Sequence, residues 1–83
     1  MHILIIEDDA AAASYIEKGL VQHGHTVDLA ADGTRGLVAA LEGHHDALVV
    51  DRMLPGLDGL SVIETLRRNG DRTPALILSA LDR

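Results

Sequence analysis

Short runs of apolar residues recur along the chain, separated by more polar segments. Three of them, residues 3–6, 47–50 and 75–78, are uninterrupted and rich in Ile, Val and Leu. A continuous apolar run of this length is typical of a strand covered on both faces, as in a parallel sheet. A weaker candidate, residues 26–30, alternates apolar and polar positions and indicates an edge strand.

Helical patterns fill the three intervals between these strands. Residues 10–23, 33–42 and 58–69 each carry an apolar stripe at helical spacing, and Gly70 is a stop signal for the third. Asp58 is a plausible N-cap for that third helix. The residues expected to face the sheet are Ala12, Ile16 and Leu20 in the first helix, Leu37, Ala40 and Leu41 in the second, and Leu60, Ile63 and Leu66 in the third.

The regular alternation of strand and helix predicts an α/β fold with a parallel, doubly wound sheet and right-handed crossovers. The 83 residues suffice for one small domain, and no linker or repeat divides them. A chain of this length buries only about 60–65% of its unfolded surface, so we expect a thin stability margin.

The amino-acid composition argues against several classes of function. The formal net charge is −6, which argues against direct binding to nucleic acid or to anionic membranes. The absence of cysteine excludes disulfides and thiolate chemistry and fits a cytoplasmic protein. The apolar run at residues 3–6 is too short for a signal peptide or a membrane span.

Candidate chemistry lies directly after the apolar runs, because open α/β sheets bind ligands beyond the carboxyl ends of their strands. Glu7, Asp8 and Asp9 follow the first run, Asp51 the third and Ser79 the fourth. If the first and third strands are neighbours, Glu7, Asp8 and Asp51 share one crevice, where a hard cation such as Mg²⁺ would relieve their repulsion. The alternative is that these acids are solvated loop residues.

Three motifs lie in order along the chain: Ile-Glu-Asp-Asp after the first strand, Asp-x-Met-Leu-Pro-Gly-x-Asp-Gly after the third, and Leu-Ser-Ala at the fourth. Together they resemble receiver domains of two-component response regulators, in particular transcriptional regulators with a winged-helix DNA-binding domain. The resemblance covers the whole chain. It implies a flavodoxin-like sheet with strand order 2-1-3-4.

The resemblance also implies roles for five residues. Asp51 matches the phosphoacceptor, phosphorylated by a sensor histidine kinase, and Asp8 matches the direct Mg²⁺ ligand. Glu7 matches the second acid, which usually holds the metal through water, and Met53 the position whose backbone carbonyl completes the site. Ser79 matches the hydroxyl that turns toward the phosphoryl group. The implied protein is a signalling switch for transcription and not an enzyme.

Receiver domains of this kind continue after the fourth strand with a helix, a strand and a last helix. The sequence ends before these elements, before the lysine that the resemblance places on that later strand, and before any DNA-binding domain. DNA contact is therefore expected only through a domain not present in the chain. We further expect weakened phosphotransfer, and self-association through the apolar edge at residues 75–78.

The motifs also bear on three functions other than that of a receiver. A cobalamin-binding module needs a histidine where Met53 stands, and a hydrolase with an aspartyl nucleophile needs Asp-x-Asp after the first strand, so both are rejected. A structural fragment that no longer takes phosphate stays open.

The histidines are expected to be exposed residues near helix ends and turns. His23 with His25, and the adjacent His44 and His45, could bind a transition metal only if the fold brought them together. The expectation of an exposed residue applies to His2 as well.

Overall fold

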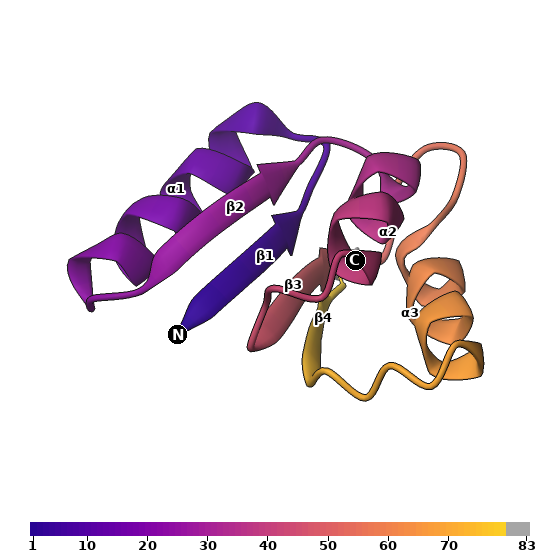
Figure 1. Ribbon diagram of the computed structural model, residues 1–83. Helices are drawn as coiled ribbons and strands as arrows, with labels where there is room; N and C mark the ends of the chain where they lie inside the picture. Colours follow the sequence, from indigo (N-terminus) through magenta and orange to yellow (C-terminus); the bar gives the residue numbers. More distant parts are fainter. Residues whose placement is uncertain (80–83) are drawn as a thin grey trace.

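The computed structural model describes residues 1–79, in which strands and helices alternate along the chain (Figure 1). Each element lies within one residue of the bounds expected from the sequence. Ala80, the last residue of the Leu-Ser-Ala motif, lies outside the described residues. The elements are β1 (His2–Ile6), α1 (Ala10–Gln22), β2 (Thr26–Ala30), α2 (Gly33–Leu41), β3 (Ala47–Asp51), α3 (Gly59–Arg68) and β4 (Ala75–Leu78).

The strands form one parallel sheet in the order β2-β1-β3-β4, which confirms the expected topology. The central strand β1 pairs with β2 on one side and β3 on the other, and its residues 3–6 are all buried. This burial on both faces explains the unbroken apolar run. At the carboxyl edge, Asp51 of β3 lies opposite Leu78 of β4.

Helices cover both faces of the sheet (Figure 1). Helix α1 packs against β1 and β2 on one face, while α2 and α3 pack against each other on the opposite face. The main core lies on the α2–α3 face and is aliphatic: Leu4, Ile6, Ala30, Ala40, Leu48, Val50, Leu54, Val62 and Leu66.

Two of the residues expected to face the core are exposed instead. Leu60 of α3 is 41% exposed and Leu41 of α2 is 45% exposed. The buried stripe of α3 is Gly59, Val62 and Leu66, because this helix packs against α2 and shares a buried core with Leu48 and Val50 of β3. The expectation was therefore wrong for Leu60 and Leu41.

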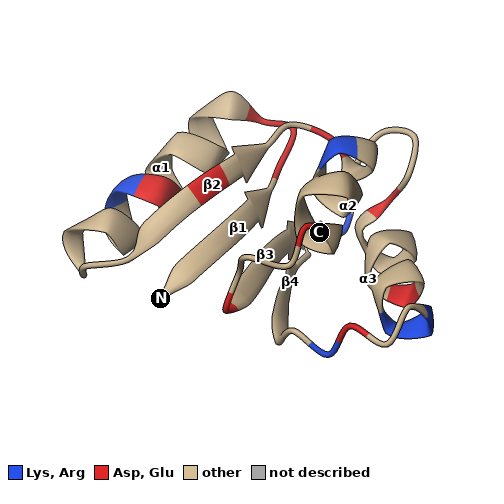
Figure 2. Cartoon of the chain, viewed as in Figure 1, with Lys and Arg blue, Asp and Glu red and all other residues tan. Residues whose placement is uncertain are grey.

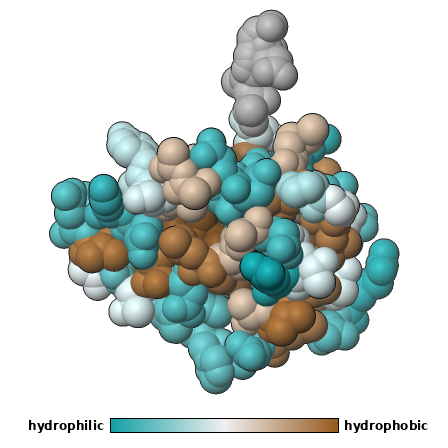
Figure 3. Space-filling model, turned by 90° about the horizontal axis from the view of Figure 1, so that it is seen from above, coloured by the Kyte–Doolittle hydropathy of each residue, from teal (hydrophilic) through white to brown (hydrophobic). Residues whose placement is uncertain are grey.

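The outer edge of the sheet is apolar. Within residues 1–79, β4 has a neighbour on one side alone, and its Leu76 and Ile77 are 61% and 38% exposed. Apolar patches also lie among hydrophilic residues on the face seen from above (Figure 3). None of the helices in the described part of the chain has the length and apolar character needed to cross a membrane.

Candidate functional site

Three carboxylates converge at the carboxyl edge of the sheet. Glu7 and Asp8 follow β1, and Asp51 is the last residue of the adjacent strand β3. One carboxylate oxygen from each residue lies within 4.8 Å of the others. Figure 2 shows acidic segments gathered where these strands end. The crevice expected from the sequence is present, since the ends of neighbouring parallel strands meet at one edge.

The three acids differ in their surroundings. Glu7 is buried, with 9% of its surface exposed, and its Oε2 accepts a hydrogen bond from the Asp9 amide at 3.0 Å. Asp8 is exposed and Asp51 is half-buried. The Oδ1 of Asp51 accepts a hydrogen bond from the Met53 amide at 3.1 Å, which orients the start of the following loop. The Met53 side chain points to solvent, with 71% of the residue exposed.

Burial raises the pKa of Glu7 to about 7. The hydrogen bond from the Asp9 amide opposes this pKa shift, and the neighbouring Asp51 and Asp8 carboxyl groups add to it. Full ionisation of the cluster is therefore unfavourable near neutral pH without a counter-charge. Oxygen-only donors with this need for positive charge match the ligand preference of Mg²⁺.

The raised pKa of Glu7 predicts how stability depends on pH without Mg²⁺. Between its ordinary pKa of 4.5 and the folded-state pKa of about 7, Glu7 of the folded protein holds a proton that the unfolded chain has lost. The Glu7 contribution to the free energy of unfolding is therefore fully present below pH 4.5 and is lost as the pH rises through about 7.

Urea unfolding of the wild type and Glu7→Gln at several pH values in chelator measures this contribution. The wild type should lose stability relative to Glu7→Gln across that pH range, and Mg²⁺ should stabilise the wild type most at the upper end. Glu42→Gln, at an exposed position after α2, is the matched control and should follow the wild type. Parallel stability curves for the wild type and Glu7→Gln would contradict the prediction.

The loop between β3 and α3 borders the acidic cluster. It forms an open depression of about 600 Å³ beside Asp8. The lining residues are Asp8, Arg52, Met53, Leu54, Pro55, Gly56, Asp58 and Leu60. The depression gives a route from solvent to the carboxyl edge of the sheet.

Ser79 lies at the same edge as the acids. It directly follows Leu78, the strand partner of Asp51, and its side chain is exposed. This position suits a hydroxyl that approaches a group attached to Asp51. The expected roles of Ser79 and of the Met53 carbonyl stay predictions.

Aspartates cap the three helices. Asp58 is the N-cap of α3, as expected, and accepts a hydrogen bond from the Ser61 amide at 2.8 Å. This hydrogen bond holds the pKa of Asp58 below its usual value. Asp9 caps α1 and Asp32 caps α2. The role of Asp32 was missed, although an aspartate directly before a helical pattern is a recognisable signal.

The histidine expectation was wrong for two residues. His45 is not an exposed loop residue, because only 4% of its side chain is accessible, and the His2 side chain is 31% accessible. Both rings contact Asp28. The sequence suggested other groupings because it does not show that β2 and the chain before β3 meet beside the start of β1.

Residues 3–83 match the response regulator receiver domain family. The chain is 44% identical over 80 residues to the transcriptional regulatory protein PcoR of Escherichia coli, covering 96% of this chain and 35% of that protein. It therefore spans about a third of the length of the curated relatives it matches.

Solved structures show the same fold. The Francisella response regulator 1452 receiver domain has a TM-score of 0.92 and 35% identity, over 99% of this chain and 68% of that one. The response regulator TrrA from Thermotoga maritima, in complex with Mg²⁺ and BeF, has a TM-score of 0.91 and 25% identity, over 98% of this chain and 70% of that one.

Proposed function

The chain belongs to the response regulator receiver domain family, and from this membership we propose that Asp51 accepts a phosphoryl group from a sensor histidine kinase. The observation that carries the proposal is the convergence of Glu7, Asp8 and Asp51 at the carboxyl edge of the sheet. A lone strand-end aspartate is an ordinary loop residue, but three carboxylates from two neighbouring strands provide both a nucleophile and a cation site.

In the proposed reaction, a carboxylate oxygen of Asp51 attacks phosphorus, and the bond from phosphorus to the kinase imidazole breaks. The imidazole nitrogen keeps the electron pair, and the product is an acyl phosphate on Asp51. Asp8, Asp51 and the Met53 carbonyl would hold Mg²⁺, with Glu7 acting through water. Mg²⁺ supplies positive charge that offsets the repulsion between a carboxylate and an incoming phosphoryl group.

Ser79 is proposed to detect the product. Its hydroxyl would donate a hydrogen bond to a phosphoryl oxygen on Asp51, and the accompanying shift after β4 would transmit the change. The position of Ser79 directly after the strand partner of Asp51 supports this role.

The wider role rests on the relatives. We propose that residues 1–83 are the N-terminal part of a receiver domain in a cytoplasmic regulator, supported by the 68% coverage of the Francisella receiver and the name of PcoR. Such a protein carries a phosphoryl group as a signal to a transcriptional output domain. Contact with DNA would be made by that output domain alone. The protein would not act as an enzyme with a released product.

A covalent adduct tests the proposal. Incubation with acetyl phosphate and Mg²⁺, followed by intact-mass analysis, should reveal a species that carries one phosphoryl group. The adduct should be absent when a chelator removes Mg²⁺. A chain that folds but never gains the adduct would favour the alternative of a structural fragment.

Self-association of the 83-residue chain is proposed from the apolar edge of β4. The exposed Leu76 and Ile77 lie on β4, which has no strand on its outer side within residues 1–79, and an apolar edge strand favours pairing with a second copy. Light scattering should give a mass that rises with concentration. Ile77→Lys should shift the chain to monomer, because an edge lysine opposes pairing.

Val38→Lys is the matched control for this experiment. Val38 is 57% exposed on α2, so the substitution makes the same change of charge away from the sheet edge. It should leave the association unchanged. A wild-type mass that stays monomeric at all concentrations would refute the proposed association.

A further inference from the structure

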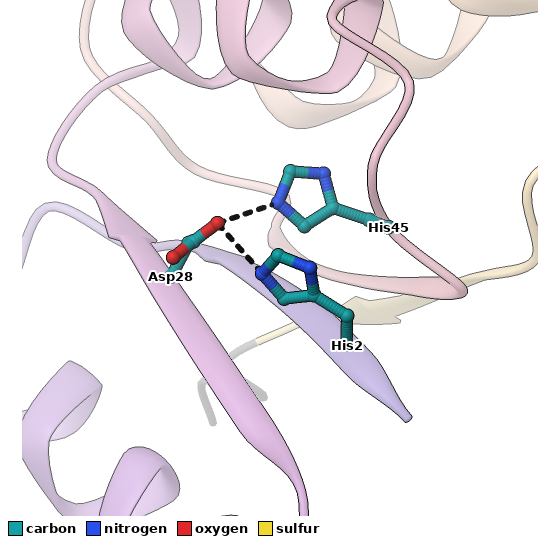
Figure 4. Close-up of side chains that lie close together, drawn as sticks. All are labelled: His2, Asp28 and His45. Carbon is teal, nitrogen blue, oxygen red and sulfur yellow. Dashed lines mark hydrogen bonds and ion pairs between the residues drawn. The ribbon is translucent and has the colours of Figure 1, made fainter.

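A second cluster of ligating side chains lies away from the acidic crevice. His2 begins β1, Asp28 lies in β2, and His45 precedes β3. Figure 4 shows both imidazole rings turned toward the Asp28 carboxylate. The Nε2 atoms of His2 and His45 lie 2.8 and 2.9 Å from the same oxygen, Asp28 Oδ2.

The cluster is separate from the proposed phosphoacceptor site. His2 starts β1, whereas Glu7 follows its other end. At a rise of about 3.3 Å per residue, roughly 16 Å of extended backbone separates the two positions. A ligand in one cluster would therefore not contact the other.

The donor atoms are those of a zinc site. One ligand atom from each of His2, Asp28 and His45 lies within 4.8 Å of the others. Two imidazole nitrogens and one carboxylate oxygen form a common Zn²⁺ ligand set, with the fourth position left for water. Mg²⁺ prefers oxygen ligands alone, so the two clusters suit different cations.

The charges near the cluster also favour a cation. Within residues 1–79, the ion pairs of Asp28 are with the two imidazoles and with no lysine or arginine. A second carboxylate, that of Asp46, accepts a hydrogen bond from the His2 backbone amide at 2.7 Å. Two carboxylates therefore lie beside the His2 backbone or its ring, and the N-terminal ammonium of Met1, which contacts His25, offsets part of their negative charge.

Hydrogen bonding alone leaves the buried ring of His45 half satisfied. Its Nδ1 is buried and has no hydrogen-bond partner among the described residues, so Nε2 provides the ring's polar contact. Nε2 is therefore the ring atom of His45 that is placed to bind a cation together with Asp28.

We propose that His2, Asp28 and His45 bind Zn²⁺. Each imidazole would coordinate through Nε2 and carry its proton on Nδ1, and Asp28 would bind as the carboxylate. Zn–N bonds of about 2.0–2.1 Å require ligand atoms about 3.3 Å apart. The imidazole Nε2 atoms, now 2.8 and 2.9 Å from Asp28 Oδ2, must therefore move slightly away from that oxygen to admit the ion. The Asp28 side chain is 52% accessible and is free to contribute to that separation.

Zinc at this position would join three segments that are distant in sequence: β1, β2 and the chain entering β3. The three ligands come together only in the folded chain, so zinc binds the folded protein in preference to the unfolded chain. Zinc should therefore raise the melting temperature. The expected role is stabilisation of the sheet at the end opposite the phosphoacceptor.

Zinc titration against a chromophoric chelator tests the proposal, with Co²⁺ absorption reporting the ligand geometry. The wild type should bind one Zn²⁺ per chain, and excess Mg²⁺ should not displace it. His2→Gln and Asp28→Asn should each weaken zinc binding at least tenfold, as expected from losses seen even for outer-shell partners. Both positions are partly exposed, so these variants should fold, which circular dichroism checks.

Two control variants locate the metal. His44→Gln removes the adjacent, exposed histidine, and Asp51→Asn alters the acidic crevice; both should bind zinc like the wild type and gain the same thermal shift. The proposal is overturned if the wild type binds no zinc, if His2→Gln and Asp28→Asn bind normally, or if Asp51→Asn is the variant that loses zinc.

Discussion

Asp51→Asn should reduce the phosphoryl adduct formed with acetyl phosphate and Mg²⁺ to background. An amide oxygen carries no negative charge and is not a competent nucleophile for phosphoryl transfer. The substitution also removes one of three carboxylates that converge at the carboxyl edge, so the cation site is weakened together with the acceptor. Both effects act in the same direction, which makes this the largest change expected for any single substitution in the site.

Asp58→Asn is the matched control for Asp51→Asn. It makes the same chemical change at the far end of the loop that follows Asp51, and asparagine caps helices about as well as aspartate. The wild-type adduct should therefore form, with stability changed by no more than about 0.5 kcal/mol. Intact-mass analysis after equal incubation compares the three proteins. An adduct that persists in Asp51→Asn would place the phosphoryl group elsewhere and end the assignment of Asp51.

Gly59→Ala should lower the free energy of unfolding by about 1–3 kcal/mol, since overpacking a close-packed region typically costs this much. Gly59 begins α3 and its amide donates a hydrogen bond to the Arg52 carbonyl at 3.1 Å. A Cβ on Gly59 would overlap the Asp51 carbonyl oxygen and lie 3.0 Å from the Arg52 Cα. These neighbours are backbone atoms, so a side-chain rotation cannot relieve the overlap.

The same substitution should also reduce phosphorylation. Relief of the overlap requires α3 to move away from the end of β3, and that movement displaces Asp51 and the loop beside Asp8. Gly19→Ala is the matched control, because a Cβ there meets no atom within 4 Å and Gly19 lies inside α1. It should raise stability by about 0.5–1 kcal/mol. Urea unfolding measures both variants, and equal effects of the two would contradict the packing argument.

The sequence predicted the elements, the sheet order and the acidic crevice. Element type follows from local periodicity, and the site follows from a rule of parallel sheets: side chains after neighbouring strands meet at one edge. Glu7, Asp8 and Asp51 could therefore be grouped before any coordinates were known, once the resemblance had implied that β1 and β3 are neighbours.

The tertiary structure decided what depends on contacts between distant segments. Val62 is buried and Leu60 is exposed, because α3 packs on α2 and shares a core with residues of β3, which the helix's own pattern does not show. Gly59 proved to be a close backbone contact with Asp51.

The sites at the two ends of the sheet differ in how far the sequence alone reveals them. Asp51 at the carboxyl edge follows an apolar run that marks its position locally. The cluster of His2, Asp28 and His45 has no local signal, because its members come from three segments that only strand register and the chain entering β3 bring together. Sequence periodicity determined where each segment lies within its own element, and only the folded chain decided which side chains from different segments meet.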